Sequence, residues 1–120
     1  MKKRKGTSLR KIVSKAQEKK VAKEIGGRVV AGSGASMYSK GDVENRDILV
    51  ECKTTARPNI TVKGEWLEKI YMEALDKRKT PALSIELRGK TGIAPQDWVL
   101  IPLNVFSELV ERGCFEKDKT

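Results

Sequence analysis

Residues 47–54 restrict the fold of this chain more than any other segment. They read Asp-Ile-Leu-Val-Glu-Cys-Lys-Thr, and a short apolar run of this kind is typical of a buried β-strand. Because side chains alternate along a strand, Glu51 and Lys53 point to one face, and Val50 and Cys52 to the other. Two opposite charges at the end of a core strand indicate either a structural ion pair or a site that uses an acid beside a cation.

The elements predicted around this strand indicate an α/β fold. Periodicity and turn residues predict helices over residues 8–25, 65–79 and 103–112. They predict further strands over 28–31, 42–43, 60–62, 82–87 and 97–101. The 120 residues have the length of one domain, which we expect to span 8–120 behind a flexible basic arm at 1–7. The order of elements predicts a mixed sheet with helices packed on it.

The net charge of +9 is concentrated at the N-terminal end. Residues 1–30 contain eleven Lys or Arg residues and two Glu residues, whereas the other 90 residues are neutral overall. A basic block favours a polyanionic partner, because cations that neutralise phosphates release counterions. We expect nucleic acid rather than an anionic membrane surface, since the start has few apolar anchors. A solvated tail that aids solubility is the simpler alternative.

The residues that the chain lacks exclude several kinds of site. It has no histidine, and Cys52 and Cys114 form no CxxC pair, so a zinc site of the usual type cannot be assembled. The basic residues 2–5 precede no apolar run typical of a signal peptide, and no stretch has the length of a membrane span. We therefore expect a cytoplasmic protein with reduced thiols and no small-molecule cofactor.

The first predicted helix carries a carboxylate at the head of an apolar stripe. Two stripes lie on nearly opposite sides of it, one formed by Leu9, Ile12, Val13 and Ala16, the other by Val21, Ala22 and Ile25. Glu18 heads the second stripe. A buried charge needs a cation, a metal or an opening nearby, unless Glu18 reaches water at the edge or pairs with Lys15 or Arg28. The first stripe requires another surface, for which a partner subunit is one candidate.

Asp42 is the second candidate acid. A hairpin that turns over residues 44–46 returns the chain, so that Asp42 and Glu51 can converge from adjacent strands. Two carboxylates with a backbone carbonyl between them offer the hard oxygen ligands that Mg²⁺ takes. Asp47 is the competing acid, but its place at the turn indicates a solvated strand start.

Four motifs in this order resemble the PD-(D/E)XK nuclease superfamily. They are Glu18, Gly32-Ser33-Gly34-Ala35, Gly41-Asp42-Val43 and Leu49-Val50-Glu51-Cys52-Lys53-Thr54. Within the superfamily, residues 16–103 are most similar to the small Holliday junction resolvases of archaea and some phages. The resemblance implies a restriction-endonuclease-like fold, a central mixed β-sheet flanked by helices. Gly41 replaces the motif's usual proline, and the interval between Glu18 and Ser33 is short for the archaeal enzymes.

The resemblance implies a role for each matching residue. Asp42 and Glu51 would bind Mg²⁺, for which Mn²⁺ can substitute. The backbone carbonyl of Cys52 would be a further ligand, and Glu18 would complete the acidic cluster. Lys53 would position the attacking water and stabilise charge that develops in the transition state.

The remaining site residues are those expected to approach the substrate. Ser33, in its glycine-flanked loop, would approach the scissile phosphate or the metal and act as a further catalytic residue. The residues expected to contact DNA are Lys2, Lys3, Arg4, Lys5, Arg10, Lys11, Ser33 and Lys40. By contrast, we interpret Arg57, Lys63 and Lys69 as scattered surface cations, and Trp66 and Trp98 as residues that pack in the core or on the sheet.

These features predict a metal-dependent endodeoxyribonuclease that resolves four-way junctions by symmetric cuts in DNA recombination and repair. Its setting would be the cytoplasm of a prokaryotic or phage-infected cell. Two symmetric cuts need two sites, which a two-fold homodimer supplies, and branched DNA would be selected by shape and backbone contacts. The alternatives are a phage or mobile-element nuclease acting on flaps, ends or single strands, a non-catalytic DNA-binding accessory protein, and an RNA-binding basic protein.

Overall fold

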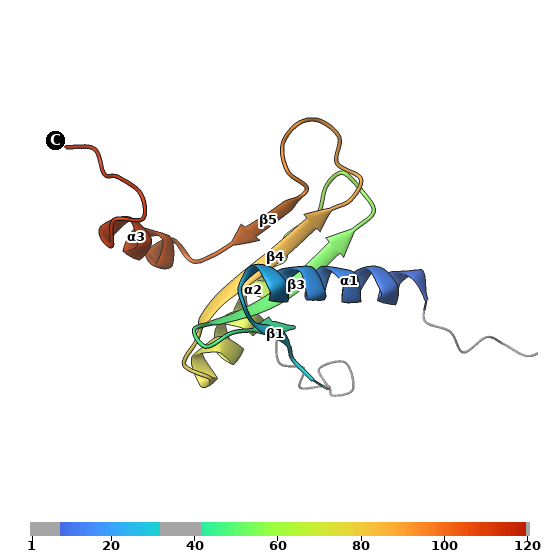
Figure 1. Ribbon diagram of the computed structural model, residues 1–120, viewed down its shortest axis with the longest axis horizontal. Helices are drawn as coiled ribbons and strands as arrows, with labels where there is room; N and C mark the ends of the chain where they lie inside the picture. The colour runs from blue at the N-terminus through green and yellow to red at the C-terminus, as the bar shows by residue number, and fades with distance from the viewer. Residues whose placement is uncertain (1–7, 32–41, 120) are drawn as a thin grey trace, which may run out of the picture.

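The protein is built around one five-stranded mixed β-sheet with the strand order β1-β2-β3-β4-β5. The computed structural model describes residues 8–31 and 42–119. Helix α1 covers one face of the sheet and α2 the other, while α3 lies beyond the end of β5 (Figure 1). The elements are α1 (Leu9–Glu24), β1 (Arg28–Val29), β2 (Val43–Glu44), β3 (Ile48–Thr55), α2 (Gly64–Asp76), β4 (Thr80–Leu87), β5 (Asp97–Leu100) and α3 (Leu103–Glu111). The predicted α/β class is confirmed.

The chain enters the sheet through an antiparallel hairpin and crosses to a parallel strand. Strands β1, β2 and β3 pair antiparallel, β3 and β4 pair in parallel over eight residues, and β5 returns antiparallel to β4. Asn45 shapes the β2–β3 turn, because its Oδ1 accepts the backbone N–H groups of Asp47 and Ile48 at 2.8 Å. The predicted strand at 60–62 is wrong. These residues belong to the connection from β3 to α2 and pair with no strand of the described sheet.

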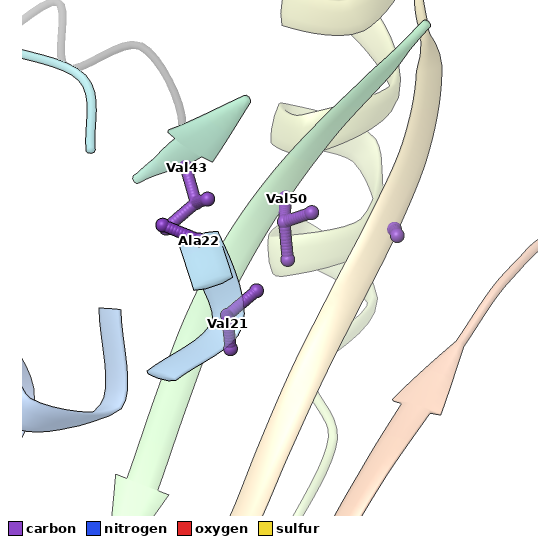
Figure 2. Packing of buried hydrophobic residues seen from close by; sticks show 5 residues of the cluster. Val21, Ala22, Val43 and Val50 are labelled. Carbon is purple, nitrogen blue, oxygen red and sulfur yellow. The ribbon is translucent and has the colours of Figure 1, made fainter. Parts of the chain in front are cut away.

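Two apolar clusters, one on each face of the sheet, hold the layers together. Val21 and Ala22 of α1 pack with Val43, Val50 and Ala82 on one face (Figure 2). On the other face, the cluster consists of Leu49, Ile70 and Ala74. Full burial of a Val or Leu side chain contributes roughly 1.5–3 kcal/mol, so these contacts set the positions of both helices. Because Glu51 and Lys53 alternate in step with Leu49, they point toward α2.

The start of α1 is capped, and it shows the predicted break in its apolar pattern. The Ser8 hydroxyl accepts the Lys11 N–H at 3.2 Å, which caps the helix. The first stripe does not face the core, since Leu9 is 74% exposed and Ile12 53% exposed. The second stripe does, because Val21 and Ala22 are buried.

The far edge of the sheet is less covered than the sequence predicts. Trp98 is 51% exposed on β5, so of its two predicted places the core is excluded and a place on the sheet is left. The physical reason is that β5 is an edge strand, and α3 continues past its end instead of folding over it (Figure 1). Leu103 and Phe106 of α3 are exposed as well. None of the helices in residues 8–31 and 42–119 has the length and apolar character required to cross a bilayer.

Candidate active site

Asp42 and Glu51 meet where the pairing between β2 and β3 ends. Within the described residues, β2 pairs with β3 only as far as Val50. Asp42 directly precedes β2, and its backbone N–H donates to the Val50 carbonyl at 2.8 Å. Its carboxylate then takes the place of a strand neighbour, since Oδ2 accepts the Cys52 N–H at 2.8 Å. This bond holds the Asp42 carboxylate against β3, one residue from Glu51.

The acidic side chains at this edge of β3 interact electrostatically. Burial raises the pKa of Asp42, and the charge of Glu51 raises it further, against the opposing effects of the Cys52 N–H, Lys69 and Lys53. Burial also raises the pKa of Glu18, with Asp42 and Glu51 adding to the shift. Glu18 of α1, Asp42 before β2 and Glu51 of β3 are therefore three carboxylates that repel one another. Each of these charges opposes the ionisation of its neighbours.

Two lysines lie beside Glu51. Its carboxylate is 3.5 Å from Lys53 Nζ and 3.3 Å from Lys69 Nζ. Lys53 Nζ also sits 4.5 Å from the ring centre of Trp66, a cation–π contact that limits the positions of the ammonium group. The predicted adjacency of Glu51 and Lys53 is confirmed as an ion pair. Trp66 is partly buried beneath Lys53, consistent with packing on the sheet.

Lys69 is a site residue that the sequence interpretation missed. We interpreted it as a scattered surface cation, whereas it pairs with Glu51 and, at 3.1 Å, with Glu73 one helical turn away. A signal was available, because Lys69 adjoins Ile70, the residue through which α2 packs against β3. A long side chain next to that contact can reach the strand.

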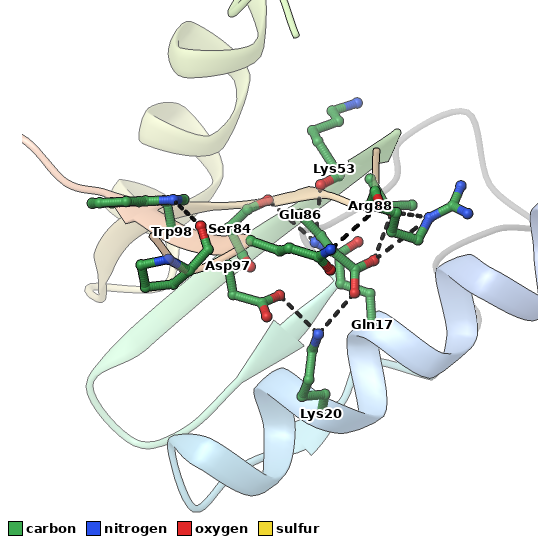
Figure 3. A network of polar contacts seen from close by, with 11 residues as sticks. Gln17, Lys20, Lys53, Ser84, Glu86, Arg88, Asp97 and Trp98 are labelled. Carbon is green, nitrogen blue, oxygen red and sulfur yellow. Dashed lines mark hydrogen bonds and ion pairs between the residues drawn. The ribbon is translucent and has the colours of Figure 1, made fainter. Parts of the chain in front are cut away.

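Gln17 is a second missed residue, and it supports the strand from the other face. It is only 2% exposed. Its Nε2 donates to the carbonyl of Lys53 at 2.9 Å and to that of Ser84 at 3.4 Å, which links α1 to both parallel strands (Figure 3). The sequence contains a signal for this burial: Gln17 lies four residues after Val13 and four before Val21, so the three side chains share one face of the helix.

A separate ionic network lies on the α1 face of the sheet (Figure 3). Lys20 Nζ lies 2.7 Å from Glu86 and 2.7 Å from Asp97, so it ties α1 to β4 and β5. The Thr54 hydroxyl donates to Glu86 at 2.6 Å. Although burial opposes ionisation, the hydrogen bonds from Lys20 and Thr54 hold the pKa of Glu86 below its usual value. Glu86 is thus a compensated anion with a structural role.

The donor chemistry at the acidic edge suits a hard divalent ion, although the side chains are not arranged as a finished coordination shell. In residues 8–31 and 42–119, no three His, Cys, Asp or Glu side chains converge as a metal-ligand set. Asp42 and Glu51 nevertheless present carboxylate oxygens of the kind that Mg²⁺ takes. Burial raises the pKa of the Cys52 thiol, with Asp42 adding to the shift, so this thiol stays neutral and only its backbone carbonyl is a suitable donor.

The structure locates only part of the predicted DNA-contacting set. Arg10 and Lys11 are exposed on the first turn of α1. Asp47, the competing acid, is exposed at the turn before β3, whereas Asp42 lies beside Glu51. The predicted residues outside the described part of the chain are Lys2, Lys3, Arg4, Lys5, Ser33 and Lys40.

Comparison with known proteins found no family model, no curated protein and no solved structure that matches this chain.

Proposed function

We propose that the protein is a metal-dependent DNA endonuclease whose reaction centre is formed by Asp42, Glu51 and Lys53. The proposal depends on one observation, the contacts among Asp42, Glu51 and Lys53 at the edge of β3. There the Asp42 carboxylate is hydrogen-bonded to the backbone next to Glu51, and Lys53 pairs with Glu51 at 3.5 Å. Acids at the edge of an otherwise basic protein suit a cation placed between the protein and a phosphate. A protein that only binds a polyanion gains nothing from them.

Each residue of the centre would have a separate task. Asp42, Glu51 and the Cys52 carbonyl would hold Mg²⁺ or Mn²⁺, with Glu18 at the margin of the cluster. The ion supplies Lewis-acid activation of water and neutralises charge on the phosphate. Lys53 would orient the attacking water and, as a fixed cation, stabilise the negative charge that grows on the phosphate oxygens. The ring of Trp66 limits the positions of that ammonium group.

We further propose branched DNA as the substrate and a homodimer as the working form, with a restriction-endonuclease-like fold. The mixed sheet with helices on both faces is the arrangement that the resemblance implies. A second copy of the chain also accounts for exposed apolar side chains, which monomeric proteins rarely gather in large patches. They are carried by α2, β5 and α3 and include Tyr71, Met72, Leu75, Val99, Leu100, Leu103 and Phe106.

Digestion of a synthetic four-way junction tests the proposal, with Asp42→Asn as the variant and Asp47→Asn as its matched control. The amide introduced by Asp42→Asn keeps an oxygen that can accept the Cys52 N–H, so the strand edge is retained while the charge is lost. Loss of an outer-shell partner of a metal site typically costs about 10–100-fold, so loss of a ligand should reduce cutting by more than about 100-fold. Junction binding should persist. Asp47→Asn, at an exposed position, should cut like the unmodified protein.

The same assay separates the alternatives. Paired nicks in the junction, absent with EDTA, are the expected result. Preferential cutting of flaps, ends or single strands would support the proposed reaction centre but contradict the four-way junction as its substrate. Cutting that is unaffected by Asp42→Asn, or no cutting of any DNA with Mg²⁺ or Mn²⁺, would contradict the proposed reaction centre and leave a binding protein.

A further inference from the structure

A polar pocket of about 460 Å³ lies next to the proposed reaction centre, where β3 and β4 end. It is open to solvent and is formed by the first half of α1, the end of β3 and the residue after β4. Of its lining residues, Arg10, Ser14, Thr54 and Arg88 present polar side chains on the α1 side, whereas alternation along β3 turns the side chains of Lys53 and Thr55 toward α2. The first four comprise two cations and two hydroxyl groups, and no carboxylate belongs to the described lining. This combination suits an anion with several oxygen acceptors.

The nearest acid, Glu86, makes its short contacts with groups other than Arg88. Glu86 is already bonded to Lys20 at 2.7 Å and to the Thr54 hydroxyl at 2.6 Å, whereas Arg88 Nε is 3.9 Å from it. Arg88 Nε donates instead to Thr54 Oγ1 at 3.1 Å, which fixes the direction of the side chain. In Figure 3 the outer guanidinium nitrogens of Arg88 point away from Glu86. They are therefore positioned to donate two hydrogen bonds to a phosphate, as a guanidinium does.

The pocket extends along β3 from Cys52, and Arg88 lies at its far end, where its N–H donates to the Thr55 carbonyl at 2.9 Å. Thr55 follows Glu51 by four residues, which along an extended strand corresponds to about 13 Å. Lys53 lies between the two places along β3, and its ammonium group pairs with Glu51 on the α2 side. A nucleic acid strand that passes the reaction centre would thus meet a second anion site along β3.

We propose that this pocket binds a phosphodiester of the nucleic acid backbone other than the one that is cut, held by Arg10 and Arg88. The assignment rests on the proposed nuclease function for the position of the cut, but its binding chemistry does not depend on it. The pocket would set the register of the strand, so that a particular phosphate reaches Asp42 and Glu51.

The test is metal-free binding of a fluorescent four-way junction and of a linear duplex in EDTA, over a range of salt concentrations. The variants are Arg10→Gln, Arg88→Gln and the double variant. The control is Arg46→Gln/Arg78→Gln, which removes the same charge from exposed residues at the opposite ends of β3 and β4. The double variant should lose roughly three- to tenfold in affinity at about 0.1 M salt, and its slope of log K against log salt should become shallower by about 0.9, the value for one phosphate.

The control should keep the slope of the unmodified protein. An equal loss in the control and the double variant would overturn the proposal, because only diffuse charge would then matter. An unchanged slope in folded Arg10→Gln and Arg88→Gln would also overturn it. Calorimetric titration with inorganic phosphate supplies another arm: phosphate binding that depends on Arg88, without any change in DNA affinity, would replace the backbone assignment with a free-phosphate site. None of these results depends on cutting, which Asp42→Asn tests separately.

Discussion

Gln17→Glu should turn the buried link behind β3 into a repulsive contact without changing its shape. Gln17 Nε2 donates to two carbonyl oxygens, those of Lys53 and Ser84, and the side chain is 2% exposed. A carboxylate at this position has no proton to donate, so an oxygen would replace the nitrogen 2.9 Å from the Lys53 carbonyl. Because Gln and Glu are nearly isosteric, no cavity contributes to the effect.

The expected loss of stability depends on whether the new carboxyl group is ionised or protonated in the folded protein. If it stays ionised, two hydrogen bonds worth about 0.5–1.5 kcal/mol each are lost and an uncompensated charge is buried, which costs about 3–5 kcal/mol. If it takes up a proton, it can donate to one carbonyl again. Protonating a group of ordinary pKa near 4.3 at pH 7 costs about 3.7 kcal/mol, which limits the charge penalty. We therefore expect a loss of about 3–5 kcal/mol at pH 7.

The loss should depend on pH in a defined direction. The folded variant would have a carboxyl pKa above that of the unfolded chain, so the folded state holds the extra proton. Stability should therefore fall as the pH rises above about 4.3, by up to about 1.4 kcal/mol per unit until the folded pKa is reached. Urea unfolding of Gln17→Glu and of the unmodified protein at pH 4, 5.5 and 7 measures this. Near pH 4 the difference should shrink to about 1 kcal/mol.

Gln96→Glu provides the matched control. Gln96 is exposed, and its Nε2 donates to the Arg88 carbonyl at 3.4 Å. The same chemical change there should alter stability by less than about 0.5 kcal/mol at every pH. Equal stability of Gln17→Glu and the unmodified protein at pH 7, or a loss that does not depend on pH, would refute the assignment of Gln17 as a buried donor.

Two further changes test the ionic network and the close packing at the end of α1. Because the pKa of Glu86 is lowered in the folded state, its ionised form stabilises the fold above the pKa of the unfolded chain, and this contribution is lost as the pH falls through the folded value. Glu86→Gln should thus cost about 1–2 kcal/mol in urea unfolding at pH 7 and little at pH 3.5; a pH-independent cost would contradict the role of the charge. Gly27→Ala would place a Cβ well inside van der Waals contact with the Glu44 carbonyl oxygen and should lower stability by about 1–3 kcal/mol in thermal unfolding. At Gly64 an added Cβ meets nothing within 4 Å, so Gly64→Ala should be neutral or stabilising, and equal effects of the two glycine changes would count against the clash.

The acid pair and its lysine were predictable because their signals are local. Alternation along β3 places Glu51 and Lys53 on one face, and a three-residue turn brings Asp42 back to the same strand. The break in the apolar pattern of α1 likewise marked Glu18 as a carboxylate that needs a compensating environment. In the structure these residues lie near the same edge of β3, while the metal and the reaction remain predictions.

Local patterns could not supply the contacts between distant elements. The ion pair between Lys69 and Glu51, the reach of Gln17 to two strands and the pocket between Arg10 and Arg88 depend on how far each helix is shifted along the sheet. The same limit explains the error at residues 60–62 and the choice left open for Trp98, because an apolar strand pattern does not reveal whether a partner strand or a covering helix is present. Periodicity specifies which face of an element is apolar, whereas register and coverage follow from packing summed over the whole sheet.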